Sequence, residues 1–239
     1  MFKKLIEIRN KEMIYPGLIG IFINPFYIIR RGLYVKVKAN AGYMKGKLLD
    51  FGCGNKPFKQ LFNVDEYIGL DLEKSNDRIF NKDAEIYYDG KSIPFNDNYF
   101  DCVLASEVFE HVFNIDEILK EIHRVCKPNG YLLLTVPFIW DEHEVPYDFG
   151  RYTSYGISYL MNKHGFEIIT QEKTTNYIET IFQMWNAYIY KHIFKHQIAK
   201  ILFTPIFIAP VTIIGLILSK ILPKNFNFFH NNVVLAKVT

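Results

Sequence analysis

Apolar and polar residues occur in alternating blocks between residues 48 and 136. The runs at 101–106 and 131–136 are nearly continuous in apolar and β-branched side chains, which is typical of strands buried on both faces of a sheet. Between them, apolar residues recur at spacings of three and four over 115–126, which predicts an amphipathic helix. This order of strand, helix and strand predicts parallel βαβ units in an α/β fold.

Several local signals mark the ends of helices. Asn114, with Glu117 three residues later, has the spacing of a capping box. Thr153 predicts the start of a helix that Gly165 closes. The Asn-Pro pair at 24–25 predicts another helix start ahead of the sheet, because proline is favoured in the first turn.

Residues 176–224 do not fit a minimal α/β sheet. Apolar side chains recur at helical spacing over 178–193, and the 18 residues of 201–218 carry no charge, which is near the lower limit for a membrane span. However, residues 231–239 have the pattern of a last strand. The chain must then return to the side that it left, which argues against a single span.

Pro205 and Pro210 interrupt the uncharged run, so we expect a bend there. Two helical arms of about nine residues would each reach roughly 13 Å, about one leaflet of a bilayer. The sequence thus favours a helical hairpin over 198–222 in peripheral contact with a membrane, flanked by lysines and aromatic residues. The alternative is a hairpin buried against the protein's own helices or against a second copy in a homodimer.

Composition narrows the class of protein. The chain has 239 residues, of which 49% are hydrophobic and 22% charged, enough for one large or two small globular domains. A net charge of +3 without a long basic block argues against nucleic acid as a partner. The three scattered cysteines predict neither disulfides nor zinc, and no signal peptide is expected, so we predict a cytoplasmic location, possible also at the inner face of the cell membrane.

The segment KLLDFGCGNKP, residues 47–57, reads as a strand, a tight turn and a helix start. Gly52 and Gly54 let the backbone turn sharply and approach a ligand. Pro57 argues against the dinucleotide pattern GxGxxG, which needs glycine at that position. Lys56 stands where the looser acidic-GxGxG pattern has its third glycine. An ordinary strand-to-helix turn is the alternative reading of this segment alone.

A second acidic residue follows at a suggestive distance. Asp71 ends the predicted strand 66–71, 21 residues after Asp50. In nucleotide-binding α/β folds, a carboxylate about 20 residues beyond the glycine loop accepts hydrogen bonds from ribose hydroxyls. The alternative is that Asp71 caps the next segment.

Four blocks within residues 48–137 together resemble class I S-adenosylmethionine (SAM)-dependent methyltransferases: LLDFGCGNKPF, YIGLDL, IPFNDNYFDCVLASEVFEHV and LKEIHRVCKPNGYLLLTVP. The resemblance implies a Rossmann-like, seven-stranded, mostly parallel sheet with an antiparallel last strand and helices on both faces. Here the apolar helical insertion would precede that strand. It also implies SAM as the cofactor. Lys56 is the main departure from the family pattern and concerns the geometry of the glycine loop.

The resemblance further implies the cofactor contacts. The glycine loop would line the methionine part of SAM, the end of the second strand the ribose, residues 89–90 the adenine, and residues 106–107 the sulfonium. The residues assigned in this way are Asp50, Gly52, Cys53, Gly54, Asp71, Leu72, Asp89, Gly90, Ser106 and Glu107.

Polar and aromatic residues crowd the loop after the fifth predicted strand, at the rim where α/β folds bind ligands. His143 is the candidate base for a hydroxyl acceptor, and His111 is a second one. Arg151 could clamp an anionic group, or instead form a structural ion pair with Asp148. The candidate substrate-binding residues are Glu144, Tyr147, Asp148, Arg151 and Tyr152.

The sequence therefore predicts an enzyme, a SAM-dependent methyltransferase with a small-molecule acceptor. The block HEVPYDFGRYT resembles methyltransferases of bacterial surface-polysaccharide synthesis, which implies a hydroxyl of a saccharide or lipid-linked saccharide. The alternatives are a quinone or polyprenyl-lipid acceptor, and a non-catalytic membrane scaffold. No metal-ligand spacing is visible, so no metal is predicted. The predicted division is a helical extension over 1–46 and a methyltransferase domain over 47–239, with its insertion at about 176–224.

Overall fold

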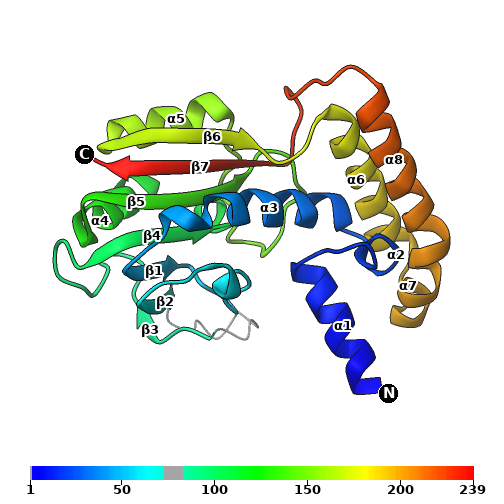
Figure 1. Cartoon of the computed structure of the whole chain (residues 1–239), viewed down its shortest axis with the longest axis horizontal. Helices are drawn as coiled ribbons and strands as arrows, with labels where there is room; N and C mark the ends of the chain where they lie inside the picture. The colour runs from blue at the N-terminus through cyan, green and yellow to red at the C-terminus, as the bar shows by residue number, and fades with distance from the viewer. Residues whose placement is uncertain (1, 73–82) are drawn as a thin grey trace. The chain divides into compact units, whose positions relative to one another are not determined.

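The computed structural model describes residues 2–72 and 83–239. The chain divides into two compact units (Figure 1), which are considered separately. Unit 1 combines residues 1–36 with 173–231, and unit 2 combines 37–172 with 232–239. The N-terminal segment and the later apolar segment, which the sequence suggested as an extension and an insertion, thus fall in one unit.

Unit 2 is built on a seven-stranded sheet with the order β3-β2-β1-β4-β5-β7-β6. The strands are β1 (Lys47–Phe51), β2 (Glu66–Leu72), β3 (Ile86–Tyr88), β4 (Phe100–Ser106), β5 (Cys126–Pro137), β6 (Phe166–Lys173) and β7 (Asn231–Val238). The first five pair in parallel. The Thr239 amide donates to the Gly165 carbonyl, so β7 runs antiparallel to β6. The predicted α/β fold with an antiparallel last strand is confirmed.

Burial explains why these segments form strands and helices. Most residues of β4 are buried, and so are the last six of β5, as expected for parallel strands covered on both faces. Helix α4 (Ile115–Val125) buries Ile118, Leu119 and Ile122 in the same core, and α5 (Ser154–Lys163) buries Ile157 and Met161. The rigid sheet then presents the carboxyl ends of its strands to the loops that follow them.

The predicted capping box at α4 is wrong. Asn114 is the residue before the helix, but its amide nitrogen donates to the Glu117 carboxylate at 2.8 Å instead of its oxygen accepting from the backbone. A complete capping box occurs at α6, where Asn176 and Glu179 bond reciprocally. Thr153 caps α5 as predicted, accepting from the Gly156 amide at 3.0 Å.

Unit 1 is helical. Its helices are α1 (Phe2–Ile14), α2 (Gly20–Ile23), the first part of α3 (Tyr27–Asn40), α6 (Tyr177–Tyr188) with a π-turn at Ile189–Ile193, α7 (Gln197–Phe203), a second π-turn at Thr204–Ile208, and α8 (Ala209–Ile221). Asn24 does not cap α3 directly. Its side chain accepts from the Phe26 amide, and the helix begins at Tyr27.

The predicted bend at the proline pair is wrong. Residues 197–221 form one helical run of 25 residues, long and apolar enough to cross a membrane by length and composition alone. Pro205 lies in the first turn of the π-segment, where a widened turn accommodates its ring and its missing N–H. The Thr204 hydroxyl donates to the Lys200 carbonyl beside it. The prolines therefore loosen the helix locally without breaking it.

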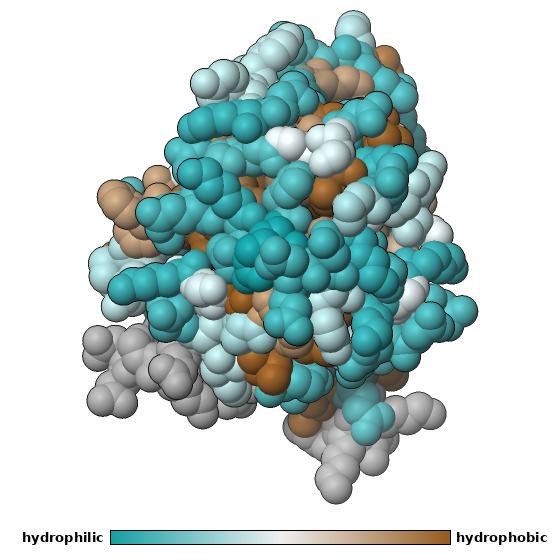
Figure 2. All heavy atoms as spheres, turned by 90° about the vertical axis from the view of Figure 1, so that its left-hand side faces the viewer, coloured by the Kyte–Doolittle hydropathy of each residue, from teal (hydrophilic) through white to brown (hydrophobic). Residues whose placement is uncertain are grey.

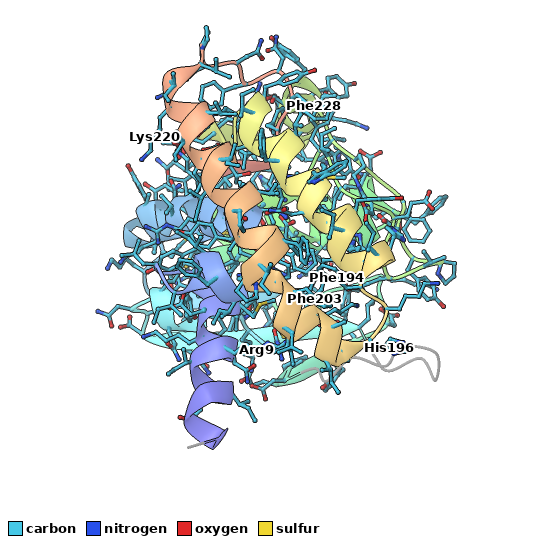
Figure 3. All side chains as sticks on the ribbon, turned by 90° about the vertical axis from the view of Figure 1, so that its right-hand side faces the viewer. Arg9, Phe194, His196, Phe203, Lys220 and Phe228 are labelled. Carbon is cyan, nitrogen blue, oxygen red and sulfur yellow. The ribbon has the colours of Figure 1, made fainter. Side chains whose placement is uncertain are left out.

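The hairpin forms instead between α6 and the run α7–α8. Figure 3 shows the turn with Phe194 and His196 at one end and Lys220 toward the other. The helices approach closely at Gly215, where an added Cβ would lie 2.7 Å from Phe182. Asn186 on α6 donates to the buried Thr212 hydroxyl on α8 at 2.9 Å. Tight packing and a buried hydrogen bond thus fix the two arms against each other.

Candidate active site

The glycine loop after β1 has two functionally different glycines. Gly52 has φ +67, and an added Cβ would lie 2.2 Å from Cγ2 of Val108, so this position packs tightly against the protein. Gly54 has φ +51, and among the described residues no atom outside its own stretch of chain lies within 4 Å of its Cβ position. The loop therefore leaves open space at Gly54, where a ligand can approach the backbone.

Lys56 takes the place of a glycine by adopting a glycine-like backbone. Its φ is +52, its residue is only 6% exposed, and its ammonium forms an ion pair with Glu85. Glu85 also accepts from the Gly69 amide at 2.6 Å. Burial alone would lower the pKa of Lys56, but the Glu85 carboxylate raises it, so the ammonium stays charged. The departure from the family pattern is thus accommodated by an ion pair between the buried Lys56 side chain and the exposed Glu85 side chain.

The helix expected after Pro57 is reduced to one 3-10 turn, Lys59–Leu61. The chain reaches β2 at Glu66, which leaves no room for more turns. The predicted helix start after Pro57 is therefore wrong, and the loop itself must supply the contacts to a ligand.

Two carboxylates flank the glycine loop. Burial raises the pKa of Asp50 to about 7, although a short hydrogen bond donated by the Tyr67 hydroxyl acts to lower this pKa. Asp71, at the end of β2, accepts from the Gly54 amide at 2.9 Å and from the Leu72 amide at 2.7 Å. A carboxylate at the end of the second strand is the group that nucleotide-binding α/β folds use to accept hydrogen bonds from ribose hydroxyls. These residues fit the predicted cofactor.

The other predicted cofactor residues lie at neighbouring strand ends. Asp89 and Gly90 follow β3, and Asp89 accepts from the Lys91 amide at 2.9 Å. Ser106 ends β4 and shares a hydrogen bond of 2.9 Å with Thr135. The parallel register places the ends of β1 to β4 side by side. Cys53 is buried beside the loop, and this burial raises the pKa of its thiol, so it stays protonated.

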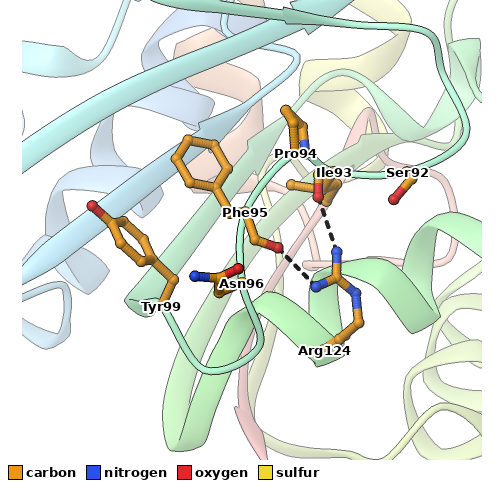
Figure 4. Close-up of a pocket in the computed structure, with 7 residues that line it drawn as sticks. All are labelled: Ser92, Ile93, Pro94, Phe95, Asn96, Tyr99 and Arg124. Atoms are coloured by element: carbon orange, nitrogen blue, oxygen red, sulfur yellow. Dashed lines mark hydrogen bonds between the residues drawn. The ribbon is translucent and has the colours of Figure 1, made fainter.

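A separate hollow of about 450 Å³ lies at the amino end of β4 (Figure 4). Its guanidinium group belongs to Arg124, which donates to the carbonyls of Ile93 and Phe95 and to the carboxylates of Asp97 and Glu121. Because protein acceptors occupy its guanidinium group, Arg124 holds the loop before β4 in place.

The rim loop after β5 is pinned to the short turn at Phe109–His111. The Phe149 amide donates to the Glu110 carbonyl at 2.7 Å. Nδ1 of His111 lies 2.7 Å from the Tyr147 carbonyl. Two of the predicted site segments, far apart in sequence, are thereby brought together.

Arg151 holds this loop internally. Its guanidinium binds Asp148 with both terminal nitrogens and also donates to the carbonyls of Asp141 and Gly150. Burial would raise the pKa of Asp148, but Arg151 outweighs it and lowers the pKa to about 2. Of the two roles considered for Arg151, the structure therefore shows the ion pair with Asp148. Substrate contacts by Glu144, Tyr147 and Tyr152 stay predictions.

The structure also assembles a group that sequence analysis missed. Glu110, His111 and His143 each offer a ligand atom, and these atoms lie within 4.8 Å of one another. The two imidazole rings meet edge to face with centroids 4.7 Å apart. The residues come from two segments without metal-ligand spacing in the sequence. The cluster forms because hydrogen bonds hold the rim loop against the turn at Phe109–His111.

Comparison with known proteins agrees with this geometry. Residues 49–134 match the family model described as "Methyltransferase domain". Residues 49–134 are therefore similar to methyltransferase domains, which take SAM as their cofactor. The matched segment covers the glycine loop and the strand ends that hold the predicted cofactor residues.

Two curated relatives are similar in sequence to part of this chain. The ubiquinone/menaquinone biosynthesis C-methyltransferase UbiE of Paraburkholderia phytofirmans is 34% identical over 116 residues, 43% of this chain and 48% of the relative. The 27-O-demethylrifamycin SV methyltransferase of Amycolatopsis mediterranei is 30% identical over 101 residues, 37% of each chain. The matches thus span less than half of these relatives.

Solved structures share the fold at low sequence identity. The [4+2]-cyclase SpnF superposes with a TM-score of 0.55 at 18% identity, covering 87% of this chain and 81% of its own. Phosphoethanolamine N-methyltransferase 2 of Haemonchus contortus, solved in complex with SAM, has a TM-score of 0.52 at 18% identity. The match covers 96% of this chain and 59% of that enzyme's chain. These similarities show the fold only.

Proposed function

We propose that this chain transfers a methyl group from SAM to an oxygen of a lipid-linked acceptor, with a saccharide hydroxyl as the first candidate. One observation carries the proposal: Gly54, open to ligand, hydrogen-bonds Asp71 at the adjoining ends of two parallel strands. That pair suits a nucleoside whose ribose hydroxyls need a carboxylate acceptor. When bound, SAM supplies a methyl carbon activated by a positively charged sulfonium.

In this proposal the protein chiefly positions its ligands. Asp71 would hold the ribose, and Gly54 would let the methionine part lie close to the backbone. Alignment of the acceptor oxygen with the methyl carbon, with water excluded, supplies most of the expected rate enhancement.

His143 is the candidate for removing the acceptor proton. Burial lowers the pKa of its imidazole, and the neighbouring His111 ring lowers it further. The ring is therefore neutral near pH 7 and can accept a proton. Its Nδ1 lies 3.2 Å from the Asp148 carboxylate, which would stabilise the protonated form.

Unit 1 supports a membrane-associated acceptor. Only 28% of the most apolar window of residues 197–221 is buried. Ile198, Ile206, Ile217 and Ile221 are among its exposed side chains. Lysines at 195, 200 and 220 flank this apolar surface, an arrangement suited to anionic lipid headgroups. We propose that this helix lies on or in the membrane surface, at the inner face of the cell membrane.

A quinone or polyprenyl lipid is the second candidate acceptor. It is favoured by the similarity to UbiE and by the internal engagement of Arg151, which leaves that guanidinium little capacity for an anionic acceptor. The fold alone does not decide the reaction, since SpnF is described as a cyclase. A non-catalytic scaffold is the remaining alternative.

The test is calorimetric titration with S-adenosylhomocysteine of the wild type, of Asp71→Ala and of the control Asp97→Ala. We expect micromolar binding that Asp71→Ala weakens at least 30-fold and Asp97→Ala leaves unchanged. Radiolabelled methyl transfer into saccharide-linked or quinone-containing lipid fractions then identifies the acceptor. A well-folded wild type that fails to bind the ligand would support the scaffold instead.

A further inference from the structure

An unusual buried acid lies beside the rim loop in unit 2. Glu110 is 0% exposed, and neither of its carboxylate oxygens has a hydrogen-bond partner among the described residues. Nε2 of His111 is also buried without a hydrogen bond there, and lies 3.9 Å from Oε1 of Glu110. Unpartnered polar atoms in a protein interior are costly and call for an explanation.

The hydrogen bonds of the two histidines indicate which ring nitrogen keeps a lone pair. Nδ1 of His111 faces the Tyr147 carbonyl at 2.7 Å, so it must carry the proton. Nδ1 of His143 lies 3.2 Å from both the Asp141 carbonyl and the Asp148 carboxylate, which favours the same tautomer. Each ring then keeps the lone pair of Nε2, one of the two imidazole nitrogens that can bind a metal ion.

We propose that Glu110, His111 and His143 bind a divalent transition-metal ion. One ligand atom from each residue already lies within 4.8 Å of the others. An ion about 2.1 Å from each atom needs separations below roughly 4.2 Å, so binding draws the ligands slightly closer. Two imidazoles with one carboxylate suit Zn²⁺, Mn²⁺, Fe²⁺ or Co²⁺, whereas Mg²⁺ and Ca²⁺ prefer oxygen ligands alone.

The groups behind the ligands match what metal sites require. Asp148 supports His143 and is itself fixed by Arg151, while a backbone carbonyl supports His111. Such outer partners orient imidazole ligands and hold their tautomer. This gives the internal ion pair of the rim loop a function beyond stabilising the loop.

The role of the ion rests on the proposed function. Glu110 follows Glu107, which the family resemblance places near the sulfonium, by three residues. Three protein ligands leave positions at the ion for an acceptor oxygen. In that case the ion would polarise the acceptor hydroxyl, which would lose its proton to solvent as its oxygen bonds the methyl carbon and the sulfonium leaves as the neutral thioether. His143 would then act as a ligand and not as a base.

The experiment uses the tag-free full chain after chelator treatment, titrated with Co²⁺ and followed by visible absorption and calorimetry. Zn²⁺ is then added as a competitor. The variants are Glu110→Gln and His143→Gln, and the control is His192→Gln/His196→Gln, which removes two exposed histidines of unit 1. S-Adenosylhomocysteine binding and thermal unfolding show that each variant is folded.

We expect one Co²⁺ per chain, displaced by Zn²⁺, with affinity reduced at least tenfold in each site variant and unchanged in the control. A wild type that binds S-adenosylhomocysteine but no stoichiometric Co²⁺ would overturn the inference and identify Glu110 as a neutral buried acid. Binding that persists in both site variants, or disappears only in the control, would also overturn it. Co²⁺ binding without S-adenosylhomocysteine binding would preserve the metal site and reject the proposed function.

Discussion

The two units differ in what lies at their surfaces. Unit 2 encloses its apolar strands between helices, and the end that carries the C-terminus is mostly hydrophilic (Figure 2). Unit 1 leaves large apolar side chains exposed along α7 and α8, and buries polar ones such as Gln183 and Asn186. A soluble domain usually shows the first arrangement. This contrast supports our proposals that unit 1 meets an apolar surrounding and that unit 2 holds a polar ligand.

The largest expected effect is a loss of ligand binding by unit 2. In Gly52→Ala, the added methyl group would overlap Val108 and would hold an unfavourable positive φ. We expect S-adenosylhomocysteine affinity to fall at least 100-fold in calorimetry and the unfolding temperature to drop. The control is Gly42→Ala, whose Cβ position is free of neighbours. Normal binding by Gly52→Ala would refute this role of the loop.

A second change tests the polar interior of unit 1. Buried Gln183 accepts from the Ile28 and Ile29 amides and donates to the Pro25 carbonyl. Gln183→Ala leaves these backbone groups unpaired, so the free energy of unfolding should fall by about 2–4 kcal/mol in denaturant titration. The exposed Gln197→Ala should change it by less than about 0.5 kcal/mol. Equal effects of the two changes would contradict the buried role of Gln183.

A third change tests whether unit 1, and not unit 2, binds a membrane surface. Replacing Ile206, Ile217 and Ile221 by serine should reduce co-sedimentation with anionic vesicles at least tenfold, because these side chains are 51–72% exposed. The matched control replaces the exposed Phe113, Tyr155 and Tyr159 of unit 2 by serine. If both triple variants lose vesicle binding equally, or neither does, unit 1 is not the membrane-facing part.

The smallest expected effect concerns pH. The pKa of Asp50 is about 7 in the folded chain, above its ordinary value in an unfolded chain. Its contribution to stability is therefore complete below about pH 4 and is lost as the pH rises through 7. Between these pH values, this one group lowers the unfolding free energy of the wild type by at most about 1.4 kcal/mol per pH unit. The Asp50→Asn variant should lack this decline. Unfolding titrations at pH 5, 6 and 7 measure the difference, and identical slopes would exclude the shift.

Sequence patterns predicted unit 2 well because its signals are local. The strands around 101–106 and 131–136, and the cap at Thr153, depend on neighbours in sequence. The site was predicted only in part. The partner of Lys56 and the meeting of Glu110 with His143 are long-range contacts that no spacing encodes.

The errors in unit 1 have a related cause. Pro205 predicts a break when read alone, but a π-turn and packing against α6 keep the helix continuous. The signal at Asn176 and Glu179 in unit 1 was overlooked, although these residues form a complete capping box. In unit 2, the similar signal at Asn114 did not cap its helix, because its amide bonds to Glu117 side chain to side chain.

The division of unit 1 between two distant stretches has a consequence for its assembly during synthesis. Gln183 pairs with backbone groups 155 residues earlier in the chain, so the first helices must wait until the ribosome has made α6 before they can pack. Most of the sheet of unit 2 emerges in between and can form first, since its parallel pairs close shorter loops. During this interval the N-terminal helices remain exposed. Folding at a lipid surface or with a chaperone would shield them from aggregation until the C-terminal helices arrive.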